Sequence, residues 1–178
     1  LDSQNPTAGT ISISDLYDSN YLRSTSEVSI TVDGWSDNTG IDTYFMGIGS
    51  SGDDEGADVV SYKNVGLTNL SLTDLTLDDF ANYFLKVVAR DGSGNLSTYV
   101  IEEFNTYTTL LGDFDNDWDV DVTDLNAFSS AWPNVDIGPA SGASPYPSPS
   151  LDGTADINDI SVFSRNWLWT KAQGKISE

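Results

Sequence analysis

The first hundred residues contain short runs in which apolar and polar positions alternate, separated by turn-forming clusters. The clearest run places Val28, Ile30 and Val32 on one side and Ser29 and Thr31 on the other, and a period of two is that of a strand with one buried face. Further runs that predict strands cover residues 11–13, 41–48, 59–62, 67–77, 83–89 and 97–104. Because no helical period appears among them, we expect an antiparallel β-sandwich over residues 1–108.

The pattern changes to a helical period in the last seventy residues. Val122, Leu125, Phe128 and Trp132 are spaced by three, three and four residues, which places them on one face of a helix. The same spacing returns 35 residues later at Ile157, Ile160, Phe163 and Trp167. Since one short helix cannot bury its own apolar face, we expect the two copies to pack together, with Phe128, Trp132, Phe163 and Trp167 between them.

An acid-rich segment leads into the first of these helices. It reads D-F-D-N-D-W-D-V-D-V-T-D from 113 to 124, with acids at loop positions 1, 3, 5, 7, 9 and 12. A calcium ion takes about six to eight oxygen ligands, and a loop with this spacing supplies them. The predicted ligands are Asp113, Asp115, Asp117, Asp119, Asp121 and Asp124. Position 6 normally needs glycine, and Trp118 stands there, at a cost of about 1–2 kcal/mol if its φ is positive.

A second copy of the loop, at 148–159, carries less charge but the expected glycine, Gly153, at position 6. Its candidate ligands are Ser148, Ser150, Asp152, Thr154, Asp156 and Asp159. Neutral hydroxyls are weaker calcium ligands than carboxylates, so the first loop is predicted to bind calcium more tightly. The second loop is interpreted either as a weak calcium site or as a structural relic.

Charge and composition narrow the range of functions. A net charge of −21 excludes nucleic acid as a natural partner and argues against anionic membrane surfaces. The chain has neither histidine nor cysteine, so Ser-His and Cys-His nucleophilic chemistry is unavailable, and we expect no enzyme activity. No apolar run is long enough to cross a membrane. Because millimolar calcium outside cells suits an acid-rich site, we expect an extracellular or cell-surface protein.

Two stretches of the first hundred residues carry a family resemblance. V-S-I-T-V-D-G-W-S-D-N-T-G-I-D-T-Y at 28–44 and V-V-A-R-D-G-S-G-N-L-S at 87–97 resemble immunoglobulin-like and fibronectin type III-like modules of bacterial secreted proteins. Such modules serve as spacers, binders or fibre units. Trp35 stands just after a predicted strand and is a candidate plug for the core. Asp33, Asp37, Asp42 and Asp91 either cluster on adjacent loops as a second kind of calcium site or each serve their own turn, and we favour the turns.

The duplicated loop and helix, from about residue 111 to 169, resembles a dockerin. The resemblance rests on aspartate at position 12, one helix per loop and the tandem copy. It implies that residues 109–178 form a small α-helical dockerin-like domain with two EF-hand-like calcium loops, which docks onto a cohesin-type β-sandwich partner. Loop positions 10 and 11, which commonly contact cohesins, fall on Val122, Thr123, Ile157 and Asn158.

The leading functional hypothesis is a non-catalytic, calcium-stabilised protein–protein assembly module. A first alternative is a structural subunit that assembles with copies of itself into an extracellular fibre or surface layer. A second alternative is a carbohydrate-binding module that recognises a surface glycan through Trp35 or exposed tyrosines, although we expect these aromatic residues to lie in the core.

Overall fold

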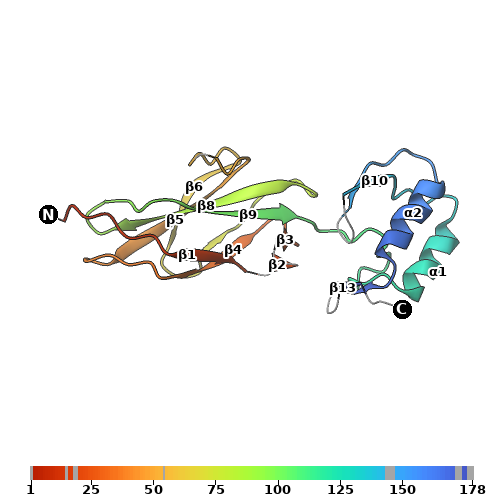
Figure 1. Ribbon diagram of the computed structural model, residues 1–178, viewed down its shortest axis with the longest axis horizontal. Helices are drawn as coiled ribbons and strands as arrows, with labels where there is room; N and C mark the ends of the chain where they lie inside the picture. Colours follow the sequence, from red (N-terminus) through yellow and green to blue (C-terminus); the bar gives the residue numbers. More distant parts are fainter. Residues whose placement is uncertain are drawn as a thin grey trace. The chain divides into compact units, whose positions relative to one another are not determined.

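The computed structural model describes residues 2–14, 16–17, 20–53, 55–142, 147–170 and 174–175. Close Cα neighbours divide the chain into two compact units, Leu1–Thr108 and Thr109–Glu178. Neither described helix is long and apolar enough to cross a membrane. Each unit has its own set of helices and strands (Figure 1).

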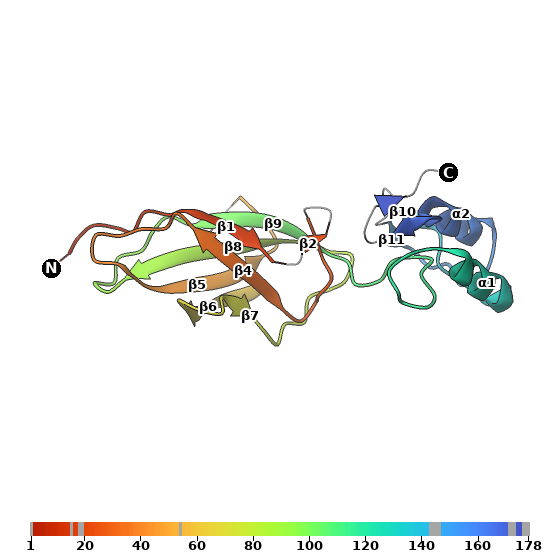
Figure 2. The ribbon, with the colours of Figure 1, turned by 90° about the horizontal axis from the view of Figure 1, so that it is seen from below.

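The first unit is a β-sandwich of two sheets. The smaller sheet has the order β1-β4-β7, made of β1 (Thr10–Ile13), β4 (Val28–Asp33) and β7 (Ser71–Leu72). The larger sheet has the order β2-β3-β9-β8-β5-β6, and its strands are β2 (Leu16–Tyr17), β3 (Tyr21–Leu22), β5 (Ile41–Gly49), β6 (Val60–Gly66), β8 (Asn82–Asp91) and β9 (Val100–Thr106). Figure 2 shows the smaller sheet crossing in front of the larger one. This division of strands is that of an immunoglobulin-like, fibronectin type III-like sandwich.

The core lies between the two sheets because alternate residues of each strand face inward. Val28 of β4, Met46 of β5 and Phe104 of β9 are fully buried in it. Trp35 packs against the same core, edge-on to Tyr44 with ring centroids 5.4 Å apart, and its Nε1 donates to the Thr10 carbonyl at 3.0 Å. The predicted role of Trp35 as a plug is therefore confirmed.

One detail of the sandwich differs from the sequence prediction. The short pair β2 and β3 was not predicted, and β3 runs parallel to β9, with Tyr21 opposite Asn105. Residues 67–77, predicted to form one or two short strands, form the two-residue strand β7. Leu70, Leu75 and Leu77 are nevertheless buried, because an irregular segment can also direct apolar side chains into a core.

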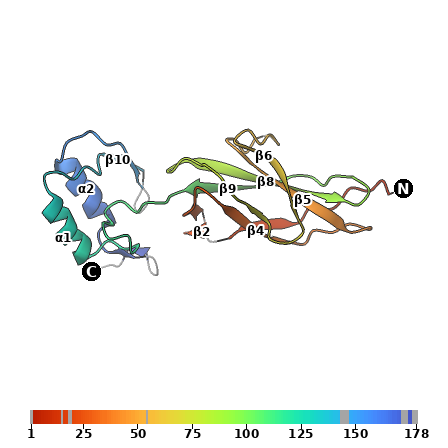
Figure 3. The same cartoon turned by 180° about the vertical axis from the view of Figure 1, so that it is seen from behind.

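The second unit contains two short helices with a loop before each. The helices are α1 (Val122–Ala131) and α2 (Ile157–Asn166), and the remaining elements are β10 (Ala140–Ser141), β11 (Ser148–Pro149), β12 (Trp169–Thr170) and β13 (Gly174–Lys175). The helices lie side by side in two opposite views (Figures 1 and 3). Phe128 of α1 stacks on Phe163 of α2 with ring centroids 4.8 Å apart, so the predicted packing of the two copies through these rings is confirmed.

The rest of the predicted helical face is not buried. Trp132 is 38% exposed, and its ring touches Phe128 from the side, with centroids 5.8 Å apart. Val122 and Ile157 are 60% and 71% exposed. The expected burial is therefore wrong for Trp132, whereas Trp167 is half-buried, with its ring centroid 5.7 Å from that of Phe163.

Candidate functional site

The two loop–helix copies share one hydrogen-bonding scheme around the aspartate at position 12. In the first copy Asp124 is fully buried, and its two carboxylate oxygens accept from Phe114 N at 2.6 Å and Asp121 N at 2.8 Å. In the second copy Asp159 is also fully buried and accepts from Asp156 N at 2.7 Å. Each pair also forms a capping box, with Asp121 and Asp156 as the N-caps of α1 and α2.

The loop preceding α1 gathers its carboxylates around Asp124. Ligand oxygens of Asp113, Asp115 and Asp124 lie within 4.8 Å of one another, and so do those of Asp119, Asp121 and Asp124. Asp117 belongs to neither group, although its Oδ1 accepts from Asp119 N at 3.1 Å. The structure thus brings together five of the six predicted ligands of this loop.

Burial and neighbouring carboxylates raise the pKa values of three acids of this loop, Asp113, Asp115 and Asp119. Burial, followed by the neighbouring Asp117 and Asp121 carboxylates, raises the pKa of Asp119 to about 6. Burial is also the main cause of the raised pKa values of Asp113 and Asp115. Asp119 Oδ1 is buried and has no hydrogen-bond partner. A bound cation would satisfy this oxygen and offset the repulsion.

The backbone conformation at position 6 is shared by the two loops. Trp118 has a φ of +69° and Gly153 a φ of +80°, so the positive φ expected at Trp118 is confirmed. Trp118 N donates to Asp113 Oδ2 at 2.9 Å. The tryptophan therefore occupies the glycine conformation, and its amide still reaches the carboxylate at position 1.

In the second loop, the carboxylate at the equivalent of position 1 belongs to Asp136. Gly153 N donates to Asp136 Oδ2 at 2.7 Å, as Trp118 N does to Asp113. Ile137 N donates to Asp159 Oδ1 at 2.8 Å, as Phe114 N does to Asp124. The described residues 139–142 and 147–150 therefore lie in an insertion within the second loop, and the constant offset of 35 residues fails before Asp152.

The serines predicted at positions 1 and 3 lie in this insertion. Ser148 is in β11 and pairs with Ser141 of β10, and Ser150 N donates to the Pro139 carbonyl at 2.7 Å. Sequence reasoning missed Asp136, since it lies 12 residues upstream of the position where a continuous loop would begin. The available signal was the tripeptide D-I-G at 136–138. Like D-F-D at 113–115, it has an aspartate followed by an apolar residue, and it stands before α2 as D-F-D stands before α1.

The second loop is less acidic than the first. Among the described residues, no group of three acids gathers there as in the first loop. Asp152 Oδ1 accepts from both Thr154 N and Thr154 Oγ1, at 2.9 and 2.5 Å. Asp136 Oδ1, like Asp119 Oδ1, is buried without a hydrogen-bond partner. Each loop therefore holds one buried carboxylate oxygen that a cation would satisfy.

The residues predicted to contact a partner lie at the start of the helices. Val122, Thr123 and Ile157 are exposed, and Asn158 is half-buried beside Asp156, whose Oδ1 accepts from its N at 2.7 Å. One turn further on, Leu125 and Ile160 are each 41% exposed. They line a groove of about 320 Å³ together with Phe128, Phe163, Ser164 and Trp167.

The sandwich carries a third acidic group and a polar hollow. Asp2, Asp37 and Asp91 have carboxylate oxygens within 4.8 Å of one another, and each accepts local hydrogen bonds, from Gln4 N, Thr39 N and Ser93 N respectively. Asp42 instead pairs with Arg90. The expectation that these acids serve only their own turns is therefore incomplete.

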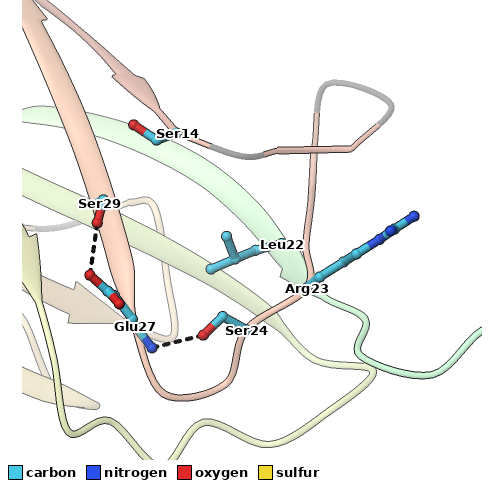
Figure 4. Close-up of a pocket in the computed structure, with 6 residues that line it drawn as sticks. All are labelled: Ser14, Leu22, Arg23, Ser24, Glu27 and Ser29. Carbon is cyan, nitrogen blue, oxygen red and sulfur yellow. Dashed lines mark hydrogen bonds between the residues drawn. The ribbon is translucent and has the colours of Figure 1, made fainter. Parts of the chain in front are cut away.

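The hollow, of about 280 Å³, is drawn in Figure 4. Ser29 Oγ donates to Glu27 Oε1 at 3.1 Å, and Glu27 N donates to Ser24 Oγ at 2.9 Å. These polar groups bond to one another across the turn, and Arg23 points away from them in the view. The hollow is thus explained by local turn structure, and no catalytic arrangement is evident in it.

The comparisons with known proteins concern the fold alone. No protein-family model and no curated protein matches the sequence. Among solved structures, the chitinase ChiA74 of Bacillus thuringiensis is 16% identical, with a TM-score of 0.44, over 62% of this chain. A fibronectin type III domain of the human KIAA0970 protein is 24% identical, with a TM-score of 0.36, over 78% of this chain and 86% of its own.

Domains FN1–FN3 of chicken CNTN1 are 16% identical, with a TM-score of 0.39, over 60% of this chain and 33% of theirs. The chain matches only 15% of the chitinase's length. The similarity is too weak to support any inference of function. The first unit is a fibronectin type III-like sandwich on the evidence of its own strand order.

Proposed function

We propose that this chain is a non-catalytic, calcium-stabilised assembly module that acts outside the cell, and that its second unit docks like a dockerin onto a β-sandwich partner of the cohesin type. The observation that carries the proposal is that both loop–helix copies expose apolar residues at equivalent positions. Val122 and Ile157 occupy equivalent positions, loop position 10 and the first residue of α1 and α2, and both are exposed apolar residues. Leu125 and Ile160 repeat this equivalence one turn later.

The calcium part of the proposal rests on the chemistry of the oxygens. Carboxylates that approach one another in partly buried loops favour a hard divalent cation. The first loop would use Asp113, Asp115, Asp117, Asp119, Asp121 and Asp124. For the second loop we propose Asp136, Asp152, Thr154, Asp156 and Asp159, with Asp136 in place of Ser148 at the first position. The orphan oxygens of Asp119 and Asp136 support one site in each loop.

The docking part rests on the exposed apolar face of α1 and α2. Exposed apolar residues scattered singly are common, whereas a contiguous set on two neighbouring helices is typical of an interaction surface. This surface consists of Val122, Leu125, Ile157 and Ile160 with the groove behind them. Since the loops orient the N-terminal ends of both helices, calcium would hold the surface in shape.

The calcium proposal is tested by isothermal titration of the full chain with calcium, alongside tryptophan fluorescence. We expect two bound ions, one ion after Asp124→Asn, and two again in the control Asp74→Asn, which changes an exposed turn acid. Trp118, Trp132 and Trp167 all lie in the second unit, so their emission reports the change. No heat and an unchanged spectrum between chelator and millimolar calcium would refute both sites.

The docking proposal is tested by surface plasmon resonance against purified cohesin modules encoded in the same genome. We expect calcium-dependent binding to at least one module. Replacing Val122 and Ile157 together by Asp should weaken it by roughly 30-fold or more, as expected for central contacts. The control Leu67→Asp places the same charge at an exposed apolar position of the sandwich. A response that is absent in calcium, or unaffected by the double substitution, contradicts the docking surface.

A further inference from the structure

The larger sheet of the sandwich has an outward side-chain layer that the core does not use. On β8, Leu85 and Val87 are fully buried in the core, so Val88 and Arg90 point to the opposite side. On β5, Phe45 stands between the core residues Tyr44 and Met46 and shares that outward side. Figure 3 shows β5 between β6 and β8, which places these residues on neighbouring strands.

This outward layer contains a groove of about 330 Å³ lined largely by aromatic rings. Phe45 comes from β5, Tyr62 from β6, and Tyr99 from the segment just before β9. Leu96, which is 42% exposed, lies at its rim. Three rings from three segments therefore meet on the outer face of the sheet.

The three rings are half-exposed, and Tyr62 and Tyr99 are inclined to each other. Tyr62 and Tyr99 have centroids 5.6 Å apart and planes inclined by 52°, so neither ring covers the other. The Tyr62 hydroxyl donates to the Glu55 carbonyl at 2.6 Å, which fixes the orientation of its ring. A ring that is already oriented loses little conformational entropy when a ligand packs against it.

Polar groups stand beside the rings and neutralise each other. Arg90 lies over the Phe45 ring, 5.3 Å from its centroid, and its Nη2 donates to Asp42 Oδ2 at 3.0 Å. The Arg90 and Asp42 side chains are 38% and 48% exposed. They therefore offer hydrogen-bond donors and acceptors to solvent beside the rings without adding net charge to the groove.

We propose that this groove binds a neutral chain of pyranose sugars. The C–H faces of a pyranose pack against aromatic faces, and its hydroxyl groups both donate and accept, as Arg90 and Asp42 require. The balanced charge of the groove suits a neutral ligand, and the chain's net charge of −21 repels an anionic one. A peptide added as a strand would need a sheet edge, whereas this groove lies on a sheet face.

The test uses the full chain and four neutral probes: cellohexaose, N-acetylchitohexaose, mannohexaose and xylohexaose. Isothermal titration is expected to detect at least one of them with a Kd of about 1 mM or tighter. Tyr62→Ala and Tyr99→Ala should each weaken binding about tenfold or more, whereas Leu67→Ala, outside the groove, should leave it unchanged. Thermal unfolding of each variant verifies that it is folded.

Two further variants keep the test decisive if an alanine variant does not fold. Tyr99→Phe retains the ring and should retain sugar binding. Arg90→Met removes the guanidinium group and should weaken sugar binding. Failure of all four sugars to bind at about 10 mM would overturn the proposal. Binding that survives loss of both tyrosine rings or of the Arg90 guanidinium group would also overturn it, by placing the site elsewhere. Sugar binding should persist in chelator and in Asp124→Asn, which separates this proposal from the calcium-dependent docking.

Discussion

The two units of this chain are stabilised in different ways. The centre of the sandwich is a continuous apolar cluster in which Val28, Met46 and Phe104 are fully buried. In the second unit, the fully buried residues include the carboxylates Asp124 and Asp159 as well as apolar side chains. Burial of apolar area stabilises the first unit in water with or without metal, whereas the acids of the second repel one another until a cation joins them. Metal should therefore change the stability of the second unit far more than that of the sandwich.

Removal of calcium is the largest expected difference between the units. Each bound ion stabilises the folded state by about 4 kcal/mol when free calcium exceeds its Kd about 1,000-fold, so two ions contribute about 8 kcal/mol. In chelator we expect the second unit to lose its helical circular dichroism at a much lower temperature than in calcium, while the sandwich unfolds at an unchanged temperature. Differential scanning calorimetry would record this as one transition that moves and one that stays. Two stationary transitions would remove the contrast.

A core substitution in the sandwich should destabilise the first unit and leave the second unit unchanged. Phe104→Ala deletes a fully buried ring between the sheets, and such deletions cost about 3–5 kcal/mol. The loss should be the same in calcium and in chelator, as measured by urea unfolding of the sandwich transition. A calcium-dependent loss would mean that the two units are energetically coupled.

The assignment of Asp136 is tested by a matched pair in the second loop. Asp136→Ala removes the acceptor of Gly153 N and a proposed ligand, with an expected cost of about 4 kcal/mol or more in calcium because the second ion is lost as well. Ser148→Ala should change stability by no more than about 0.5 kcal/mol. Calorimetric titration should lose the second ion only in the Asp136 variant. The opposite ranking would restore the assignment of Ser148 to the first position.

Position 6 offers a comparison between the loops themselves. A Cβ added at Gly153 meets nothing within 4 Å, so Gly153→Ala should cost about 1–2 kcal/mol through its positive φ alone. Trp118→Gly removes the same strain from the first loop, partly offset by the greater flexibility of glycine, for a net gain of about 0.5–1 kcal/mol. Calcium-saturated thermal unfolding of both variants measures the two effects. Equal signs would contradict the shared loop geometry.

The smallest expected effect is that the stability of the second unit changes with pH in opposite directions in chelator and in calcium. The pKa of Asp119 is raised from 3.8 to about 6 in the folded unit, so its charge destabilises the metal-free fold above that pH. Between about pH 7 and pH 4.5 the folded form takes up the proton before the unfolded form does, and stability in chelator should rise. In calcium, protons compete with the ion, so stability should fall over the same range. Thermal unfolding at both ends of the range, with Asp119→Asn as control, measures the two slopes.

The first unit could be derived largely from its sequence, because strand period is a local property. The alternation around Val28 and the D-G-S-G-N turn at 91–95 correspond to β4 and to a turn in which Asp91 Oδ1 accepts from Ser93 N and Asn95 N. The parallel contact of β3 with β9 could not be derived, because Tyr21 and Asn105 are far apart in the sequence and each segment is short. The groove of Phe45, Tyr62 and Tyr99 was missed for the same reason.

In the second unit, the repeat itself determined the helices and the aspartates at position 12. The spacing of Phe128 and Phe163 predicted their contact, since both lie at the same place in the two copies. It did not predict that Val122 and Ile157 stay exposed. An apolar stripe indicates which face of a helix avoids water, but the size of the neighbouring element decides how much of that face is covered.

The sequence by itself determined where strands, helices and acidic loops begin, because these depend on neighbours within a few residues. Only the tertiary structure decided which carboxylate stands first in the second loop. Counting residues pointed to Ser148, whereas the chain leaves the loop after Gly138, forms β10 and β11, and returns before Asp152. Asp136 reaches Gly153 across that insertion. A hydrogen bond depends on the distance between two atoms in space. An insertion lengthens the separation of two residues along the chain but can leave that distance in space unchanged.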